Sequence, residues 1–288
     1  MREFLLNLFG TKSGSVEITL FSVWHFLYLF LIAGGVVLTL VLLNKKVTEK
    51  TRQTYVRVLA WCVPGIYIFN LFVMAFLGDM GAFVDKLPFH ICTLMAIFVP
   101  FAQFNKKFEC IKDTIASLAI VSSMMYMVYP GSALGGVMPW CYKVIETFAY
   151  HGVLFAWGCL TVGTKQTNLD FKNIWKVFVG ITIIVAWAFF GTSIYSSAEH
   201  HYDWFFVTGT TFPFIPAWLM PFVVVVAVFG VNACVYLIDW IVKKIESKKL
   251  AKKATINKDE DSKQITEDES SKKEVAEEKE ISAVEEKK

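Results

Sequence analysis

Long stretches of the sequence are apolar and uninterrupted by charge. Residues 177–198 and 205–238 contain no Lys, Arg, Asp or Glu. An apolar stretch of about 20 residues is long enough, as a helix, to cross the hydrocarbon core of a bilayer. Only helices and closed barrels satisfy their backbone in lipid, and the strict alternation that a barrel strand needs is missing here. The pattern therefore predicts an all-α fold, a polytopic transmembrane helical bundle.

We expect about seven spans, separated by polar connections. The composition agrees, since 55% of the 288 residues are hydrophobic and the mean hydropathy is +0.50. Helix ends predicted from sequence are accurate to about two to four residues. The expected spans are residues 20–43, 57–77, 88–104, 110–129, 145–164, 177–196 and 215–241.

Lys and Arg are concentrated in alternate connections. The connections after the first, third and fifth spans contain eleven of them, whereas the N-terminal segment and the other connections contain four. Cytoplasmic loops of membrane proteins are enriched in Lys and Arg. We therefore expect a protein of the cell membrane with its N-terminus outside and its C-terminus inside.

Two domains are expected, a seven-helix transmembrane domain over residues 1–242 and a charged tail over residues 243–288. The tail has 13 Lys, 13 Asp or Glu and no aromatic residue. Such a segment buries too little apolar surface to offset the entropy of ordering, which predicts a disordered cytoplasmic tail. Its basic start is expected to contact anionic lipid headgroups or another protein. The net charge of +3 is attributed to the Lys and Arg residues that orient the chain in the membrane, so no nucleic-acid partner is expected.

Three histidines are expected near the outer ends of three spans that run in the same direction. His25, His90 and His151 lie a few residues into the first, third and fifth spans, which places them ~4–9 Å below the outer surface. Ionisable groups inside a membrane usually face the bundle interior or a water-filled cavity. The favoured hypothesis is an outward-facing polar pocket lined by these histidines. In the alternative, each is structural and hydrogen-bonds a nearby hydroxyl, from Ser22 or Tyr28, Thr93 and Thr147 respectively.

Several kinds of chemistry fit such a pocket. A histidine could act as a general base for a nucleophile or for a substrate hydroxyl, and Cys92 is the nearest thiol. Residues two apart on a helix lie ~200° apart around its axis, so the base for Cys92 would be His151 or His25 rather than His90. In the alternative, Cys92 is not a nucleophile but a small residue of the core. Three histidines could also hold Zn²⁺, but no short ligand spacing favours a metal, and no cofactor is expected.

Three short segments, in order along the chain, carry a family resemblance: FSVWHFLYLFLIAGG, LPFHICTLMAIFVPF and YHGVLFAWGCL. They resemble the YwaF-like family of bacterial integral membrane proteins over roughly residues 20–240. That family has a His early in its first span, L-P-x-H/Q-x-C at the start of the third and H-G in the fifth. His25, His90, Cys92 and His151 occupy the matching positions. The family looks distantly related to the eukaryotic transmembrane protein 164, a seven-span acyltransferase that acts on ether phospholipids through a Cys and a His.

The chain departs from the family pattern at two positions. In the eukaryotic relative the Cys directly precedes the third-span His, and the matching residue here is Phe89; Ser193 stands where the bacterial family tends to have Asn. The resemblance implies a membrane-bound acyltransferase whose partners are membrane lipids, with His151 as the best-supported site residue. Two alternatives stay open, namely a small-solute transporter or receptor, and a non-catalytic membrane scaffold with structural histidines.

Overall fold

The computed structural model describes residues 16–78, 80–130, 134, 137–197, 201–208 and 215–249. Within these residues the fold is helical, apart from a single β-bridge between Ile18 and Val137. Contacts within the chain define two units, Met1–Leu237 and Ile238–Lys288. The expected all-α membrane fold is therefore confirmed.

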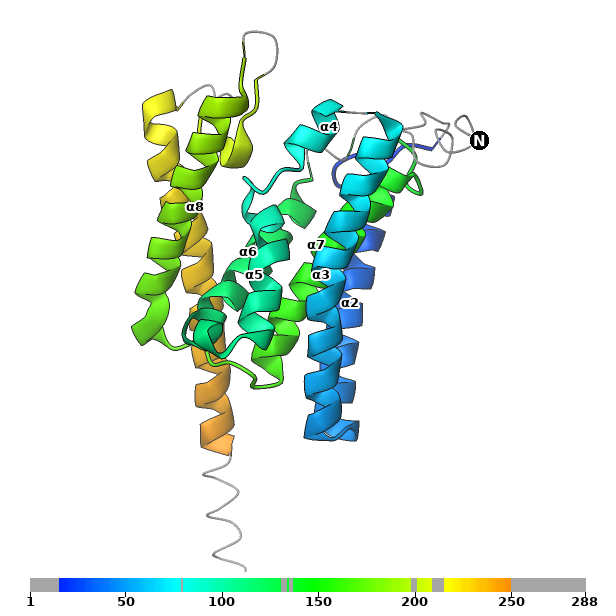
Figure 1. The fold of residues 1–288 in the computed structure, drawn as a ribbon. Helices are drawn as coiled ribbons and strands as arrows, with labels where there is room; N and C mark the ends of the chain where they lie inside the picture. Colours follow the sequence, from blue (N-terminus) through cyan, green and yellow to red (C-terminus); the bar gives the residue numbers. More distant parts are fainter. Residues whose placement is uncertain are drawn as a thin grey trace, which may run out of the picture. The chain divides into compact units, whose positions relative to one another are not determined.

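Each expected span coincides with a helix (Figure 1). The described residues contain five helical segments that are long and apolar enough to cross a membrane, and α5, with 14 residues, is a shorter apolar helix. A short helix that was not expected, α4, precedes α5. The helices are α2 Val23–Lys46, α3 Glu49–Leu77, α4 Met80–Asp85, α5 Ile91–Phe104, α6 Lys112–Val128, α7 Tyr142–Gly163, α8 Ile174–Tyr195 and the last helix, Ala217–Lys249; the 3-10 turns are η1 Lys106–Ile111, η2 Phe171–Asn173, η3 Trp204–Phe206 and η4 Ala217–Leu219.

The start of α3 differs from the expectation. The helix begins at Glu49, eight residues before the expected start of the second span. The Thr48 side chain caps it by accepting the N–H of Thr51 at 3.4 Å, and Glu49 lies in the first turn, where a negative charge favours the helix dipole. Of the basic residues expected in this loop, Lys50, Arg52 and Arg57 therefore belong to the first turns of α3, because capping lets a helix continue beyond its apolar stretch, whereas Lys45 and Lys46 end α2.

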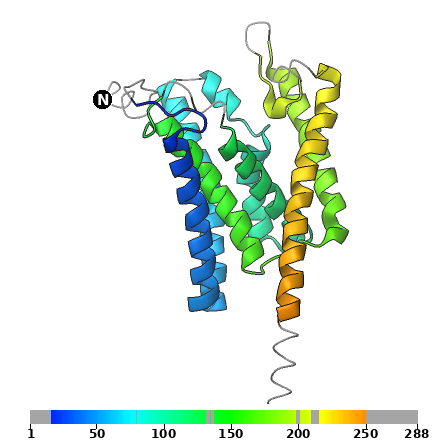
Figure 2. The same cartoon turned by 180° about the vertical axis from the view of Figure 1, so that it is seen from behind.

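Helix α6 is the most enclosed of the candidate spans in unit Met1–Leu237. In the helical segment Lys106–Val128, 72% of the most apolar 18-residue stretch is buried, whereas the corresponding share in α2 is 11%. A Cβ added at Gly158 of α7 would lie 2.7 Å from Cγ1 of Ile120 and 2.9 Å from the carbonyl oxygen of Ala116, both on α6. Small residues at such positions let helix backbones approach closely. Gly158 therefore sets the distance between α6 and α7, which run beside each other in both views (Figures 1 and 2).

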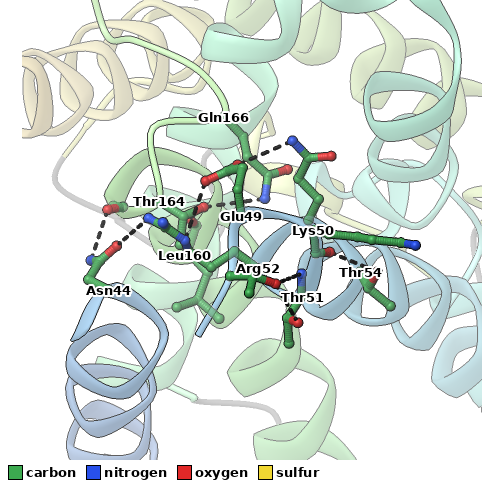
Figure 3. A network of polar contacts seen from close by, with 12 residues as sticks. Asn44, Glu49, Lys50, Thr51, Arg52, Thr54, Leu160, Thr164 and Gln166 are labelled. Carbon is green, nitrogen blue, oxygen red and sulfur yellow. Dashed lines mark hydrogen bonds and ion pairs between the residues drawn. The ribbon is translucent and has the colours of Figure 1, made fainter. Parts of the chain in front are cut away.

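The connections α2–α3, α5–α6 and α7–α8 meet at one end of the bundle, which we call the lysine-rich end. A polar network links the α2–α3 and α7–α8 connections (Figure 3), and a further hydrogen bond joins α5 to the α7–α8 connection. Asn44 of α2 donates to the carbonyl of Gly163 at 3.2 Å and accepts from Arg52 of α3 at 3.4 Å. Gln103 of α5 donates to Gln166, after α7, at 3.3 Å. These bonds satisfy polar groups where the helices end.

Unit Ile238–Lys288 is described as far as Lys249. Here the last helix carries an ion pair one turn apart, between Lys243 and Asp239, and the Lys244 ammonium lies 4.7 Å from the centre of the Trp240 ring. The helix continues past residue 242, where the tail was expected to begin. Most of the tail expected to be disordered, residues 250–288, lies outside the described residues.

We expect the lysine-rich end to face the cytoplasm. Lys50, near the start of α3, and Lys143, near the start of α7, are exposed at opposite ends. In intact cells a membrane-impermeant maleimide should label Lys143→Cys and should label Lys50→Cys only after lysis. Peptide mass spectrometry identifies the labelled position, and native Cys110, exposed at the lysine-rich end, is an internal control. Labelling of Lys50→Cys in intact cells would reverse the orientation.

Candidate active site at the histidine end

An ion pair between Lys86 and Glu146 lies at the opposite end of the bundle, called here the histidine end, where α5 and α7 begin and α6 finishes. The Lys86 ammonium is 3.5 Å from Oε2 of Glu146, whose side chain is 8% exposed. Lys86 belongs to the connection between α4 and α5, and its carbonyl accepts the Tyr67 hydroxyl at 2.8 Å. Burial disfavours the charged form of Lys86. The negative charges nearby, Glu146 foremost and also Asp85, outweigh this effect and raise the pKa of Lys86 above its usual value.

Replacing Lys86 should destabilise the protein at neutral pH. Lys86→Met leaves Glu146 buried without its cation, which should lower the free energy of unfolding by about 1–3 kcal/mol. The pKa of Lys86 is higher in the folded than in the unfolded protein. The stabilisation that the ion pair gives is therefore complete below the unfolded-state pKa of about 10.4, and it is lost as the pH rises through the folded-state pKa. Thermal unfolding in detergent should therefore show a difference at pH 7 that shrinks above pH ~10.5. Exposed Lys143→Met is the matched control, and an equal effect there would contradict the pair's role.

His151 lies on α7 and is almost fully buried, with 6% of the residue exposed. Its Nδ1 is 2.8 Å from the carbonyl oxygen of Thr147. Since a carbonyl oxygen only accepts, Nδ1 carries the hydrogen and Nε2 keeps its lone pair. The ring stacks on Tyr126 of α6 with centroids 4.1 Å apart and meets the edge of Tyr150 at 5.2 Å. The ring is thus held in one orientation and one tautomer, with Nε2 as a base.

His90 is the residue before the first turn of α5 and is half-buried. Its Nδ1 accepts the backbone N–H of Phe205 at 3.3 Å, so Nε2 carries the hydrogen. Phe205 belongs to η3 and has a φ of 59°, a left-handed conformation that costs a phenylalanine roughly 1–2 kcal/mol. His90 therefore presents a hydrogen-bond donor, whereas His151 presents an acceptor.

Cys92 lies in the second position of α5 and is buried. Its backbone carbonyl accepts the Tyr150 hydroxyl at 2.6 Å. Tyr150 immediately precedes His151. A strong hydrogen bond thus joins the start of α5 to the turn of α7 that carries the candidate base.

Phe89 occupies the position that matches the cysteine of the eukaryotic relative. Its ring packs against Trp187 and Trp204, with centroids 5.3 and 4.8 Å away. A Cβ at Gly191 of α8 would lie 2.3 Å from the Phe89 ring, so the glycine makes room for it. The side chain at position 89 therefore packs against α8 and η3.

His25 occupies a different environment. It is fully buried near the start of α2, and both ring nitrogens bond the backbone: Nε2 donates to the Met127 carbonyl at 2.8 Å, and Nδ1 accepts the Phe21 N–H at 3.0 Å. Its ring lies 5.9 Å from that of Phe148, in the smaller of two buried apolar clusters. With both nitrogens engaged, His25 links α2 to α6 and offers no free lone pair.

The hydroxyl partners expected for structural histidines were wrong in each case. The Ser22 hydroxyl accepts the backbone N–H of His25, the Thr93 hydroxyl donates to the backbone carbonyl of His90, and Thr147 bonds His151 through its carbonyl. The rings bond backbone groups, and the two groups that bond His25 lie at helix ends, where backbone groups lack partners within the helix.

Lys86 lies near three of the four expected site residues. It lies within electrostatic range of His90, Cys92 and His151, and His90 is within range of His151. Sequence analysis treated Lys86 only as an orientation signal. Its isolation on the lysine-poor side, four residues before His90, was the available clue to a functional role. Tyr126, Glu146 and Tyr150 were not selected, because tyrosines near the ends of membrane helices are common and the sequence does not show that Glu146 meets Lys86.

No three or more His, Cys, Asp or Glu side chains in the described part of the chain gather in a way that could hold a metal ion.

Comparison with known proteins identifies one family. The model of the TMEM164 family matches residues 20–238, which include the helices that carry His25, His90, Cys92 and His151. No curated protein and no solved structure matches the chain.

Proposed function

The chain is an integral membrane protein of the TMEM164 family, and on this premise we propose that it transfers acyl chains between membrane lipids at the histidine end. The observation that carries the proposal is His151. Its tautomer leaves Nε2 as a base, and the Cys92 thiol and the Lys86–Glu146 pair lie at the same end of the bundle. Acyl transfer needs these three functions, namely a base, a nucleophile and a group that stabilises an oxyanion.

In the proposed reaction Cys92 acts as the nucleophile. Its thiol gives its proton to His151, and the sulfur attacks the carbonyl carbon of a lipid ester. The carbon–oxygen ester bond then breaks, and the protonated histidine returns the proton to the departing alcohol, a lysolipid. The acyl chain is left as a thioester. The hydroxyl of a second lipid gives its proton to His151 and attacks the thioester. The carbon–sulfur bond then breaks, and His151 returns the proton to the departing sulfur of Cys92.

The oxyanion formed in each attack is stabilised by Lys86 and His90. The ammonium of Lys86 is held near the site by Glu146 at 3.5 Å, and His90 offers Nε2–H because its Nδ1 accepts from η3. Preorganised donors in a site that excludes water are among the largest contributors to catalysis. The strained turn at Phe205 supports this role, since backbone strain is often kept at functional sites.

The test is lipid mass spectrometry on purified protein reconstituted in phosphatidylcholine vesicles. The donor is a phospholipid with an isotope-labelled acyl chain, and the acceptor is a lysophospholipid. Transfer of the label to the acceptor supports the proposal. Absence of transfer across diacyl and ether lipid classes would instead favour the transporter or scaffold alternatives.

Cys92→Ser separates two forms of the mechanism. If the thioester forms, the variant should lose about 10²-fold or more in transfer rate, and hydroxylamine should release labelled acyl chains from the wild-type protein. Cys159→Ser is the control, because this free cysteine lies toward the far end of α7. A silent Cys92→Ser change without hydroxylamine release would mean that His151 activates the acceptor hydroxyl directly.

A further inference from the structure

Lys112, the first residue of α6, is a cation enclosed by protein at the lysine-rich end. The residue is 7% exposed, and within the described residues no hydrogen bond or ion pair reaches its ammonium group. The ammonium nitrogen is not among the fully enclosed polar atoms that lack a partner, so it keeps some contact with solvent. Burying a charge is costly unless it is paired. An anion from outside the described residues would supply that partner.

Arg57 brings a second cation toward the same place. It lies one turn before Trp61 on α3, and the Trp61 ring stacks on Phe104 at 5.2 Å. Phe104 is the last residue of α5, so this face of α3 packs against the corner where α5 ends and α6 begins. Arg57 and Lys112 interact electrostatically, and the guanidinium of Arg57 is exposed without a bonded partner in the described part of the chain.

Among the described residues, no acidic side chain nearby forms an ion pair with either of these two cations. Glu49 pairs with Arg52 at 3.3 Å, in the network of Figure 3. Glu109 is within electrostatic range of Lys112 but is exposed and is not within ion-pair distance of it. Asp113 uses one carboxylate oxygen to accept a backbone N–H at the start of α6, and its other oxygen is buried without a partner.

We propose that Lys112 and Arg57 bind the phosphate group of an anionic phospholipid. The two residues lie where a helical bundle meets the headgroup layer, and basic pockets between membrane helices bind such headgroups. Lys112 supplies a point charge from within the protein, and Arg57 supplies a planar fork that binds two phosphate oxygens. The site lies at the opposite end of the bundle from the histidine site, and the proposal does not depend on acyl transfer.

The test counts lipids retained by the full chain in native mass spectrometry. The protein is reconstituted in phosphatidylcholine nanodiscs with increasing phosphatidylglycerol. Lys112→Met, which keeps the length of the side chain, and Arg57→Gln should each weaken phosphatidylglycerol retention about fivefold. Lys107→Met, an exposed lysine of η1, is the matched control and should change it little. Arg57→Gln keeps the test valid if Lys112→Met fails to fold, because Arg57 is exposed.

Three results would overturn the proposal. Unchanged retention in both variants would show that the bound lipid does not depend on these cations. Displacement of the lipid by inorganic phosphate at matched ionic strength, with equal thermal stabilisation, would identify free phosphate as the ligand. If Asp113→Asn restores the stability of Lys112→Met in pure phosphatidylcholine, the ammonium serves as the partner of Asp113.

Discussion

Replacing His151 with Gln should reduce acyl transfer by about 10²–10⁴-fold while leaving the amount of folded protein in the membrane close to that of the wild type. Glutamine has a similar volume and can still hydrogen-bond near the Thr147 carbonyl, but it has no basic nitrogen. The measurement is the labelled-chain transfer assay in vesicles, normalised to protein recovered by size-exclusion chromatography.

His25→Gln is the matched control for this result. Both ring nitrogens of His25 bond backbone groups at 2.8 and 3.0 Å, so its loss should lower the free energy of unfolding by about 1–3 kcal/mol through unsatisfied buried partners. The protein that remains folded should keep its transfer rate. If His151→Gln instead lowers yield and leaves transfer unchanged, His151 is structural and the base lies elsewhere.

The second large effect is expected at Gly158. Gly158→Ala places a methyl group 2.7 Å from Ile120 and 2.9 Å from the Ala116 carbonyl. The side chain of Ile120 can rotate, but the carbonyl belongs to the backbone of α6, so α6 and α7 must separate. We expect a loss of about 1–3 kcal/mol for alanine, and little folded protein for Gly158→Val.

Gly65→Ala is the control for Gly158→Ala, because a Cβ there has no neighbour within 4 Å. It should leave the unfolding temperature unchanged or raise it slightly through the helix propensity of alanine. Thermal unfolding of the purified variants in one detergent compares the two. Equal unfolding temperatures would show that α6 and α7 can separate without cost.

The helices could be predicted from the sequence because the bilayer imposes the rule. An apolar stretch of about 20 residues has to be helical in lipid whatever its neighbours are, and each expected span overlaps a helix. The ends were less predictable. Helix α3 begins at Glu49 because Thr48 caps it, and a cap acts outside the apolar stretch from which the span was predicted.

The sequence also determined which residues are candidates for a functional site. His25, His90 and His151 were selected because an ionisable group within an apolar stretch is costly and so needs a reason. Their roles could not be separated this way. His25 is saturated by Phe21 and Met127, and His151 keeps a lone pair, because hydrogen bonds to residues on other helices or one turn away set each tautomer.

Only the tertiary structure decided which charges meet. Lys86 and Glu146 are 60 positions apart in sequence and form an ion pair at 3.5 Å, and Phe89 packs against α8 because Gly191 leaves room for its ring. The hydrophobic pattern specifies that a segment is buried in lipid or protein, because the free energy of its transfer from water depends on the composition of the segment. It does not specify which helix faces which, because that depends on how particular side chains fit together once the helices are formed.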